Sequence, residues 1–305
     1  MTRSFRFLVN PVSGGGTAPR VVVPLARRLR EGGAEVEVTY TASAAEVPPL
    51  VAEAAAADAV VVAVGGDGML SSVAGEVAAA GGVLAVVPAG RGNDFARMLG
   101  IPHEEAAQAE LLLTAEPQPV DLLAVTQDGA ERIVAGSVYS GVDARAAEIV
   151  DRSHWLPSKL QYPLAAVRAL ATYRPLDCAL RVEGPDGVVE STHRAATVVV
   201  ANSGYYGSGM HIAPAADVTD GELDVVVIEA AGRGDLIRSL PKVYDGRHVE
   251  LDAVTVLRGT RVVLHDRSGS GTVPVGADGE ALGPLGGPAS PLTVEVRPGA
   301  VRLLR

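Results

Sequence analysis

The chain has 305 residues, a length that accommodates two domains with large hydrophobic cores. Hydrophobic residues make up 48% and charged residues 20%, which is typical of a soluble globular protein, and no apolar run approaches the roughly 20 residues that cross a bilayer. The net charge of −10, from 26 basic and 36 acidic residues, argues against general nucleic-acid binding and gives the whole molecule no strong attraction to anionic lipid.

Two features indicate a reducing compartment. Cys178 is the single cysteine, which excludes an intramolecular disulfide and favours an ordinary buried thiol. The first residues, MTRSFRFLVNPVSGGG, turn to Asn-Pro-Gly chemistry too early for a signal peptide. We therefore expect a cytoplasmic protein.

The first 120 residues alternate between strand and helix patterns. Apolar residues recur at every second position in the expected strands and at helical spacing in the segments between them. Asn93 or Asp94 is placed to cap the last of these helices. The expected strands are 5–9, 36–40, 60–64 and 83–87, and the expected helices are 19–30, 44–57, 69–77 and 95–99.

This alternation implies a parallel sheet with helices on both faces, a three-layer α/β domain over residues 1–120. In such sheets, ligands bind beyond the carboxyl ends of the strands. Three glycine-bearing loops leave strands at that edge, over residues 10–16, 65–68 and 90–94. One such loop is often only a tight connection, but three at one edge predict phosphate binding.

Asp67 is the only charged residue in the Gly-Gly-Asp-Gly turn over residues 65–68. The turn has neither the Gly-Lys-Ser/Thr of a Walker A loop nor the Gly-x-Gly-x-x-Gly spacing of the dinucleotide fingerprint. Because an acid repels phosphates unless a cation lies between them, Asp67 is predicted to be either a magnesium ligand or a base toward an acceptor hydroxyl.

From residue 121 the alternation gives way to strands separated by turns, which predicts an antiparallel β-sandwich domain over residues 121–291. The tail 292–304 alternates like one or two more strands. The segment 143–173 is helical in pattern, basic, and contains Trp155; it predicts either helices that flank the sandwich or a surface that touches a membrane. The expected strands are 122–126, 132–139, 178–182, 197–202, 223–228, 261–264 and 272–275.

Three motifs resemble those of the diacylglycerol kinase catalytic domain, a family that includes bacterial soluble lipid kinases and sphingosine kinases. They are Asn10-Pro11-x-Ser13-Gly14, Gly65-Gly66-Asp67-Gly68 and Pro88-Ala89-Gly90-x-x-Asn93-Asp94-Phe95-Ala96. The resemblance implies an ATP- and Mg²⁺-dependent lipid kinase whose active site lies in an interdomain cleft. It also implies that residues 292–305 return to complete the first domain.

The resemblance further implies nucleotide contacts from the three loops and the helix after the second loop. The family usually has Thr where Met69 and Arg91 stand here, although Arg91 can itself pair with a phosphate. The implied nucleotide-binding residues are Asn10, Pro11, Ser13, Gly14, Thr41, Gly65, Gly66, Asp67, Gly68, Met69, Leu70, Ser71, Ser72, Arg91, Asn93 and Asp94.

Two acidic stretches of the second domain also match family patterns. Residues 214–224 resemble the Pro-x-Ala-x-x-x-Asp-Gly-x-Leu-Asp signature, for which the resemblance implies a structural magnesium ion. The ligands that it implies are Asp217, Asp220, the backbone carbonyl of Glu222 and, through water, Asp121.

The second stretch is the hairpin signal over residues 275–280. There Glu280 falls at the position of the family's proposed proton acceptor, and Asp278 either orients it or positions metal. The roles of Asp67 and Glu280 are open to exchange.

The sequence thus predicts an ATP-dependent lipid kinase that phosphorylates the hydroxyl of diacylglycerol or a related lipid. Two alternatives stay open: a kinase for a soluble acceptor, which a more distant likeness to NAD kinases allows, and a nucleotide-binding regulatory protein with weakened catalysis. Met69, Ser72 and Arg91 favour the regulatory alternative. We expect transient, peripheral contact with a lipid substrate at the inner face of the membrane and no nucleic-acid partner; a homodimer is left open.

Overall fold

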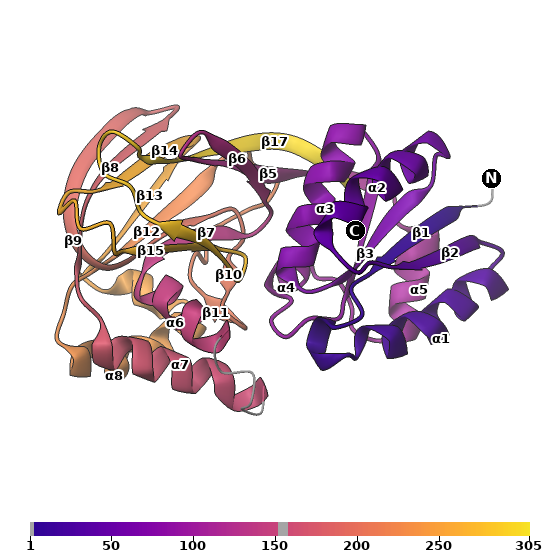
Figure 1. The fold of residues 1–305 in the computed structure, drawn as a ribbon, viewed down its shortest axis with the longest axis horizontal. Helices are drawn as coiled ribbons and strands as arrows, with labels where there is room; N and C mark the ends of the chain where they lie inside the picture. The colour runs from indigo at the N-terminus through magenta and orange to yellow at the C-terminus, as the bar shows by residue number, and fades with distance from the viewer. Residues whose placement is uncertain (1–2, 152–157) are drawn as a thin grey trace. The chain divides into compact units, whose positions relative to one another are not determined.

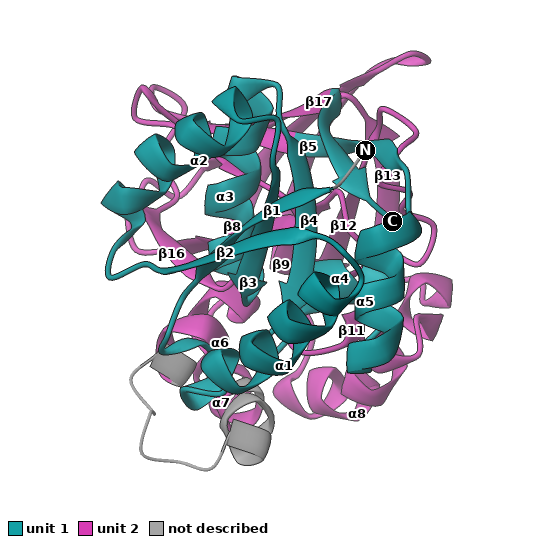
Figure 2. Cartoon of the chain, turned by 90° about the vertical axis from the view of Figure 1, so that its right-hand side faces the viewer, with its two compact units in different colours: residues 1–122, 298–305 teal, residues 123–297 magenta. Residues whose placement is uncertain are grey.

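The computed structural model describes residues 3–151 and 158–305, apart from the side chains of residues 150–151, 158–163 and 166, and the chain forms two compact units (Figure 1). Unit 1 comprises Met1–Leu122 and Pro298–Arg305, and unit 2 comprises Leu123–Arg297 (Figure 2). The chain leaves unit 1 within strand β5 (Pro117–Gln127) and returns within strand β17 (Leu292–Leu304). The sequence places these boundaries at 120/121 and 291/292.

Unit 1 contains a parallel sheet with the strand order β2-β1-β3-β4-β17. Its central strands are rich in Val and Ala and are buried along almost their whole length, as expected for a sheet covered on both faces. The strands are β1 (Ser4–Val9), β2 (Glu35–Tyr40), β3 (Val60–Gly65), β4 (Val83–Pro88) and the end of β17.

Helices cover both faces of this sheet (Figure 2). The helices are α1 (Ala18–Glu31), α2 (Val47–Ala56), α3 (Asp67–Ala80), α4 (Asp94–Met98) and α5 (Glu105–Thr114). Leu25 of α1 and Leu112 of α5 pack with Phe7 and Val62 in one core, and α2 and α3 contact each other on the opposite face. Short 3-10 helices precede α1 (Ser13–Gly15) and α2 (Ala44–Glu46).

Unit 2 is a sandwich of antiparallel strands. The 15-residue strand β9 pairs with β8 along its first part and with β7 and β12 along its last part, so it joins these two parts of the sandwich. Leu180, Val200, Val225 and Val262 lie in the core that this arrangement encloses. The strands are the end of β5, β6 (Ala130–Val134), β7 (Ser137–Gly141), β8 (Leu176–Gly184), β9 (Gly187–Ala201), β10 (Tyr205–Tyr206), β11 (Met210–His211), β12 (Leu223–Glu229), β13 (Val254–Gly259), β14 (Arg261–Asp266), β15 (Pro274–Ala277), β16 (Glu280–Pro284) and the start of β17.

Three helices cover one face of the sandwich, namely α6 (Val142–Asp151), α7 (Ser158–Thr172) and α8 (Arg233–Tyr244) (Figure 1). Leu170 of α7 and Val142 of α6 pack on Ala196 of β9. The predicted helical segment 143–173 is therefore a pair of helices, and Trp155 lies outside the described residues. The predicted architecture, an α/β domain plus an antiparallel sandwich, is confirmed.

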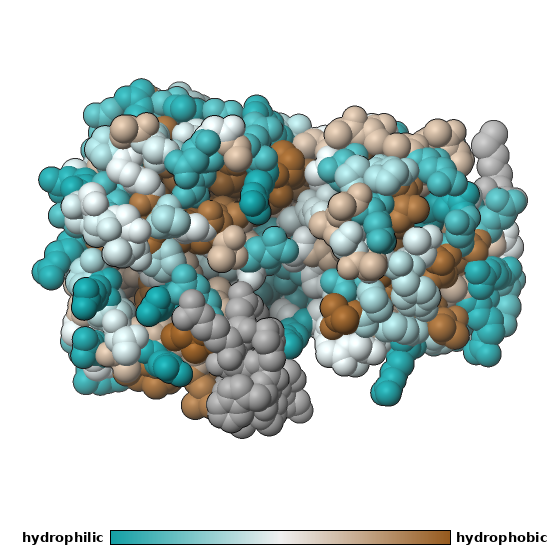
Figure 3. Space-filling view, in the orientation of Figure 1, coloured by the Kyte–Doolittle hydropathy of each residue, from teal (hydrophilic) through white to brown (hydrophobic). Residues whose placement is uncertain are grey.

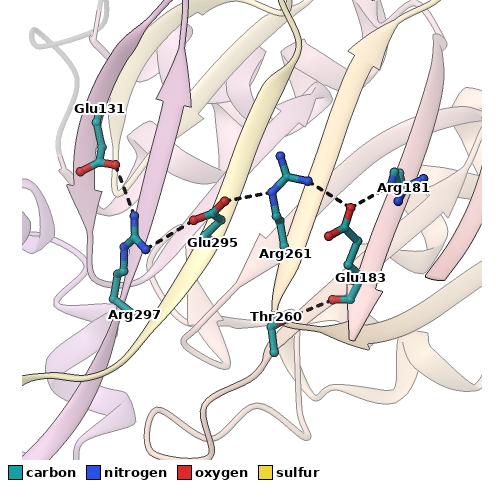
Figure 4. Close-up of polar contacts among 7 residues, drawn as sticks. All are labelled: Glu131, Arg181, Glu183, Thr260, Arg261, Glu295 and Arg297. Atoms are coloured by element: carbon teal, nitrogen blue, oxygen red, sulfur yellow. Dashed lines mark hydrogen bonds and ion pairs between the residues drawn. The ribbon is translucent and has the colours of Figure 1, made fainter. Parts of the chain in front are cut away.

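A row of alternating charges crosses the sandwich (Figure 4). Arg261 of β14 lies opposite Glu183 of β8 and Glu295 of β17, with nitrogen–oxygen distances of 3.1 and 2.9 Å. Arg181 continues the row on one side, 2.8 Å from Glu183, and Arg297 continues it on the other, 3.4 Å from Glu295. Such cross-strand pairs favour one register, although an exposed pair contributes only about 0.2–1 kcal/mol.

Candidate active site

The three glycine loops of unit 1 lie against one another at the carboxyl ends of β1, β3 and β4. A Cβ atom on Gly14 would lie 2.4 Å from the carbonyl oxygen of Ala89, and one on Gly90 would lie 2.3 Å from the Cα atom of Gly66. Real side chains do not approach backbone so closely, so these loops meet only because glycine occupies both positions. Gly66 of the Gly-Gly-Asp-Gly turn is therefore needed for the contact with Gly90 of the third loop, whether or not a ligand binds there.

Asp67 is the first residue of α3 and is half-buried. Its Oδ1 atom accepts a hydrogen bond from the backbone N–H of Phe95 at 3.0 Å. Burial raises the pKa of the Asp67 carboxyl, and hydrogen bonds from backbone N–H groups, with Phe95 and Asp94 the strongest, oppose that rise. Asp67 therefore caps α4 from a different loop.

Asn93 occupies the N-cap position of α4, as predicted, but it does not make the capping hydrogen bond. Its φ of +53° is a left-handed conformation that Asn tolerates. Its Oδ1 atom instead accepts from the N–H of Gly90 at 2.8 Å and its Nδ2 atom donates to the Gly90 carbonyl at 3.2 Å. Sequence spacing gave no sign that Asp67 would take the capping role.

A small pocket opens at this edge of unit 1. Its lining comes from the ends of β3 and β4 and from α3 and α4: Ala63, Gly65, Gly66, Asp67, Leu70, Val86, Pro88, Asn93 and Ala96. All the residues predicted to bind nucleotide belong to unit 1, and Gly65, Gly66, Asp67, Leu70 and Asn93 are among those that line the pocket.

The other predicted nucleotide residues surround this pocket or lie apart from it. Ser13 lies beside Gly65, since a Cβ on that glycine would be 3.2 Å from the Ser13 hydroxyl. Thr41 is buried, and its hydroxyl donates to the carbonyl of Val9 at 3.3 Å. The remaining residues are Asn10, Pro11 and Gly14 in the first loop, Gly68, Met69, the buried Ser71 and the exposed Ser72 in α3, and Arg91 and Asp94 in the third loop.

In unit 2, Asp278 and Gly279 form a two-residue turn between β15 and β16. Their φ angles of +46° and +86° are those of the Asp-Gly hairpin turn. The Asp278 carboxylate accepts three backbone N–H groups, from Ala135 and Gly136 at 3.0 Å each and from Ser137 at 2.9 Å. A Cβ on Gly136 would lie 2.5 Å from this carboxylate, so a larger residue there would push the carboxylate away from its backbone partners. The sequence did not single out this loop between β6 and β7.

Glu280 follows this turn as the first residue of β16. Its side chain is exposed and forms no hydrogen bond or ion pair with any residue that the structure describes. The preceding Gly279 donates its N–H to the hydroxyl of Tyr139 at 3.0 Å, and the Tyr139 ring lies directly over Gly276. The hairpin is thus held at its turn while the Glu280 carboxylate is left available.

The acidic turn before β12 surrounds the positively charged side chain of Arg258. The Nη2 atom of Arg258 lies 3.0 Å from Glu222 and also pairs with Asp220, and the Nε atom lies 3.8 Å from Asp224. Burial raises the pKa of Asp224 to about 6, against the opposing charge of Arg258.

The other two predicted metal ligands have different partners. The Oδ1 atom of Asp217 accepts from the N–H and the hydroxyl of Thr219, at 3.0 and 2.7 Å. Asp121 is buried in unit 1, where its Oδ1 atom accepts from the N–H of Gly299 at 2.6 Å. Within residues 3–151 and 158–305, no three His, Cys, Asp or Glu side chains are grouped in a way that would hold a metal ion.

Comparison with known proteins identifies the chain's relatives. Residues 4–125 match the profile of the diacylglycerol kinase catalytic domain, and residues 136–305 match the YegS C-terminal NAD kinase beta sandwich-like domain. The chain is 31% identical over 302 residues to a diacylglycerol kinase of Mycobacterium tuberculosis (strain CDC 1551 / Oshkosh), a match that covers 98% of this chain and 94% of the relative. The chain belongs to the diacylglycerol kinase family of lipid kinases.

A second curated relative is similar in sequence, and a solved structure shows the same fold. A diacylglycerol kinase of Bacillus subtilis (strain 168) is 25% identical over 293 residues, covering 92% of this chain and 91% of the relative. The crystal structure of a diacylglycerol kinase from Bacillus anthracis str. Sterne has a TM-score of 0.69 at 20% identity and covers 99% of this chain and 96% of that one. The family that the three motifs suggested is confirmed, as is the class of enzyme: a phosphotransferase with a hydroxyl acceptor.

Proposed function

We propose that this enzyme transfers the γ-phosphate of ATP to the hydroxyl of diacylglycerol or of a chemically related lipid. The observation that carries the proposal is the loop edge of unit 1, where glycines bring three loops together beside the N-terminus of α3. Unpaired N–H groups and the helix dipole make such an N-terminus attractive to phosphate.

On this proposal the loops of unit 1 hold the nucleotide. Asn10, Ser13 and Gly14 approach it from the first loop and residues 66–72 from the turn and the start of α3, while Arg91, which is exposed, pairs with a phosphate. The Thr41 hydroxyl is proposed as a further contact; it would have to exchange its hydrogen bond with Val9 to serve.

Asp67 is proposed to bind the magnesium ion that accompanies ATP. A carboxylate is the hard oxygen ligand that Mg²⁺ prefers, and the amides at the start of α4 fix its orientation. When bound, the ion would neutralise negative charge on the phosphates.

Glu280 is proposed to take the proton from the lipid hydroxyl as the hydroxyl oxygen attacks the γ-phosphate. Its exposed and unpaired carboxylate suits that role. The turn from which it extends is held by the three hydrogen bonds that Asp278 accepts from backbone N–H groups. The reverse assignment, in which Asp67 is the base, predicts that Glu280→Gln would leave most activity intact.

We further propose transient contact with the cytoplasmic face of a membrane through the helices of unit 2. Leu164 and Val167 of α7 and Ile237 of α8 are 40–49% exposed, and Arg168 lies in the same exposed row of α7. In the space-filling view, apolar residues lie among polar ones along the face of unit 2 that carries these helices (Figure 3). No helix in the described ranges combines the length and apolar character that spanning a membrane requires.

The decisive experiment incubates the protein with labelled ATP, Mg²⁺ and either a lipid extract or water-soluble acceptors. We expect label in the organic phase with wild type, a loss of about 10²–10⁴-fold in kcat with unchanged ATP binding for Glu280→Gln, and weakened ATP binding for Asp67→Ala. The matched control is Glu53→Gln, an exposed glutamate on α2.

The other outcomes separate the alternatives. Label in a water-soluble product would favour a kinase for a soluble acceptor. ATP binding without transfer to any acceptor would favour a regulatory protein and would contradict the proposal.

A further inference from the structure

The acidic turn of unit 2 lies across a strand pair from a fixed arginine. β12 and β13 are antiparallel, and their register places Asp224 directly opposite Arg258. Directly opposite residues of such a pair have Cβ atoms about 4.5–5.5 Å apart. The backbone pairing therefore places the Arg258 side chain beside the turn, and its rotamer brings the guanidinium to the carboxylates.

The guanidinium lies among three carboxylates. Its Nη2 atom is 3.0 Å from Glu222 and hydrogen-bonds to Asp220, while Nε is 3.8 Å from Asp224. Asp224 is only 2% exposed, and its Oδ1 atom has no hydrogen-bond partner among the described residues, so Arg258 is the neighbouring positive charge for this buried acid. A planar group with five N–H donors can serve several carboxylates at once.

The same arrangement does not suit a magnesium ion. Mg²⁺ requires near-octahedral oxygen ligands at about 2.0–2.1 Å, and the Arg258 guanidinium, which pairs with the implied ligand Asp220 and with the side chain of Glu222, would repel it. In addition, Asp217 is bonded to Thr219. The donor set that the family resemblance implies is therefore not gathered in this turn.

We propose that Arg258 supplies the positive charge that holds the acidic turn, in place of a structural magnesium ion. The proposal concerns the folding of the turn and does not rest on the kinase activity, because the magnesium that accompanies ATP is assigned to unit 1. It predicts that the folded state of this lipid kinase is indifferent to divalent cations when nucleotide is absent.

Thermal unfolding of the full chain tests this, in EDTA and in millimolar MgCl₂ or CaCl₂ at matched ionic strength and without nucleotide. Wild type is expected to unfold at the same temperature in all three, within about 1 °C. Arg258→Met, which keeps an unbranched apolar stem but removes the guanidinium and its charge, is expected to lose about 5 °C in EDTA and to recover part of that loss with either cation. Removal of the arginine would thus create a response to metal.

Two further arginine variants serve as controls for this experiment. Arg238→Met removes an exposed arginine that pairs with Asp235 on α8, and is expected to leave both stability and metal response unchanged. Arg258→Lys retains the charge, and is expected to be as indifferent to metal as wild type even if the Met variant does not fold. The proposal is overturned if EDTA destabilises wild type and Mg²⁺ restores it, or if Arg258→Met matches wild type in both respects.

Discussion

The loop edge of unit 1 and the β15–β16 hairpin of unit 2 both contain an Asp-Gly pair, but the two regions need glycine for different reasons. At the edge, Gly66 and Gly90 are needed because two backbones meet with no room for a Cβ. At the hairpin, Gly279 is needed for its φ of +86°, and Asp278 gathers three amides of a neighbouring loop. Added volume is therefore the way to disturb the edge, and lost hydrogen-bond capacity is the way to disturb the hairpin.

The largest effect is expected at the hairpin, from Asp278→Ala. Ala135, Gly136 and Ser137 are buried, so three N–H groups would lose their acceptor, and we expect a loss of about 3–5 kcal/mol in the free energy of unfolding. kcat should fall at least tenfold while the Kd for ATP stays unchanged. Urea unfolding and ATP titration measure both. Asp278→Asn keeps one acceptor oxygen, so its free energy of unfolding should lie between those of wild type and the Ala variant. Equal stability of the Ala variant and wild type would contradict the role assigned to Asp278.

The next effect is expected at the edge, from Gly90→Ala. The new Cβ would lie 2.3 Å from the Gly66 Cα atom, and neither backbone can yield as a flexible side chain would. We expect a loss of about 1–3 kcal/mol in stability and at least tenfold in ATP affinity, measured as above. The control is Gly234→Ala in α8, whose Cβ would meet only Arg238 at 3.7 Å and which should be neutral or slightly stabilising. Normal ATP binding by Gly90→Ala would show that the two loops do not define the nucleotide site.

A smaller, pH-dependent effect is expected from Asp143→Asn at the start of α6. Burial raises the pKa of Asp143 more than its hydrogen bonds with Thr197 and Tyr206 lower it. A carboxyl whose folded pKa is raised contributes stability that is fully present below its unfolded pKa and is lost as pH rises through the folded value.

The asparagine side chain at position 143 cannot ionise. The free energy of unfolding of this variant should therefore fall less than that of wild type as pH rises. Between pH 4 and pH 9, we expect wild type to lose about 1 kcal/mol more of its free energy of unfolding than the Asn variant, measured by urea unfolding. Parallel curves for the two proteins would show that Asp143 does not titrate in this range.

The smallest effect is expected in the exposed charge row, from Arg261→Gln. Arg261 pairs with Glu183 and Glu295 near the surface, where solvent screens the interaction. We expect a loss below about 1 kcal/mol that shrinks between 0.05 and 1 M NaCl. Arg297→Gln, farther along the row, should cost less still. A larger loss that does not depend on salt would mean that the row acts through packing.

The sequence was sufficient for most of unit 1. The β-branched run 60–64 and the glycine turn after it predict a buried strand and a helix start, and β3 and α3 lie there. Unit 2 was harder to predict, because short strands resemble one another in pattern. The strand β13 and the helix α8 were not expected, and without β13 no pattern in the sequence pointed to Arg258.

Local chemistry thus determined the alternation of strands and helices, the three glycine loops and the Asp-Gly turn before Glu280, because each depends on neighbours within a few residues. Only the tertiary structure decided the partners of the charged groups. Asp67 accepts a hydrogen bond from Phe95, and Asp278 accepts hydrogen bonds from the loop at 135–137. Arg258 reaches the acidic turn because β13 pairs with β12. Those partners depend on which strands become neighbours, a choice made by the burial of whole faces rather than by any motif.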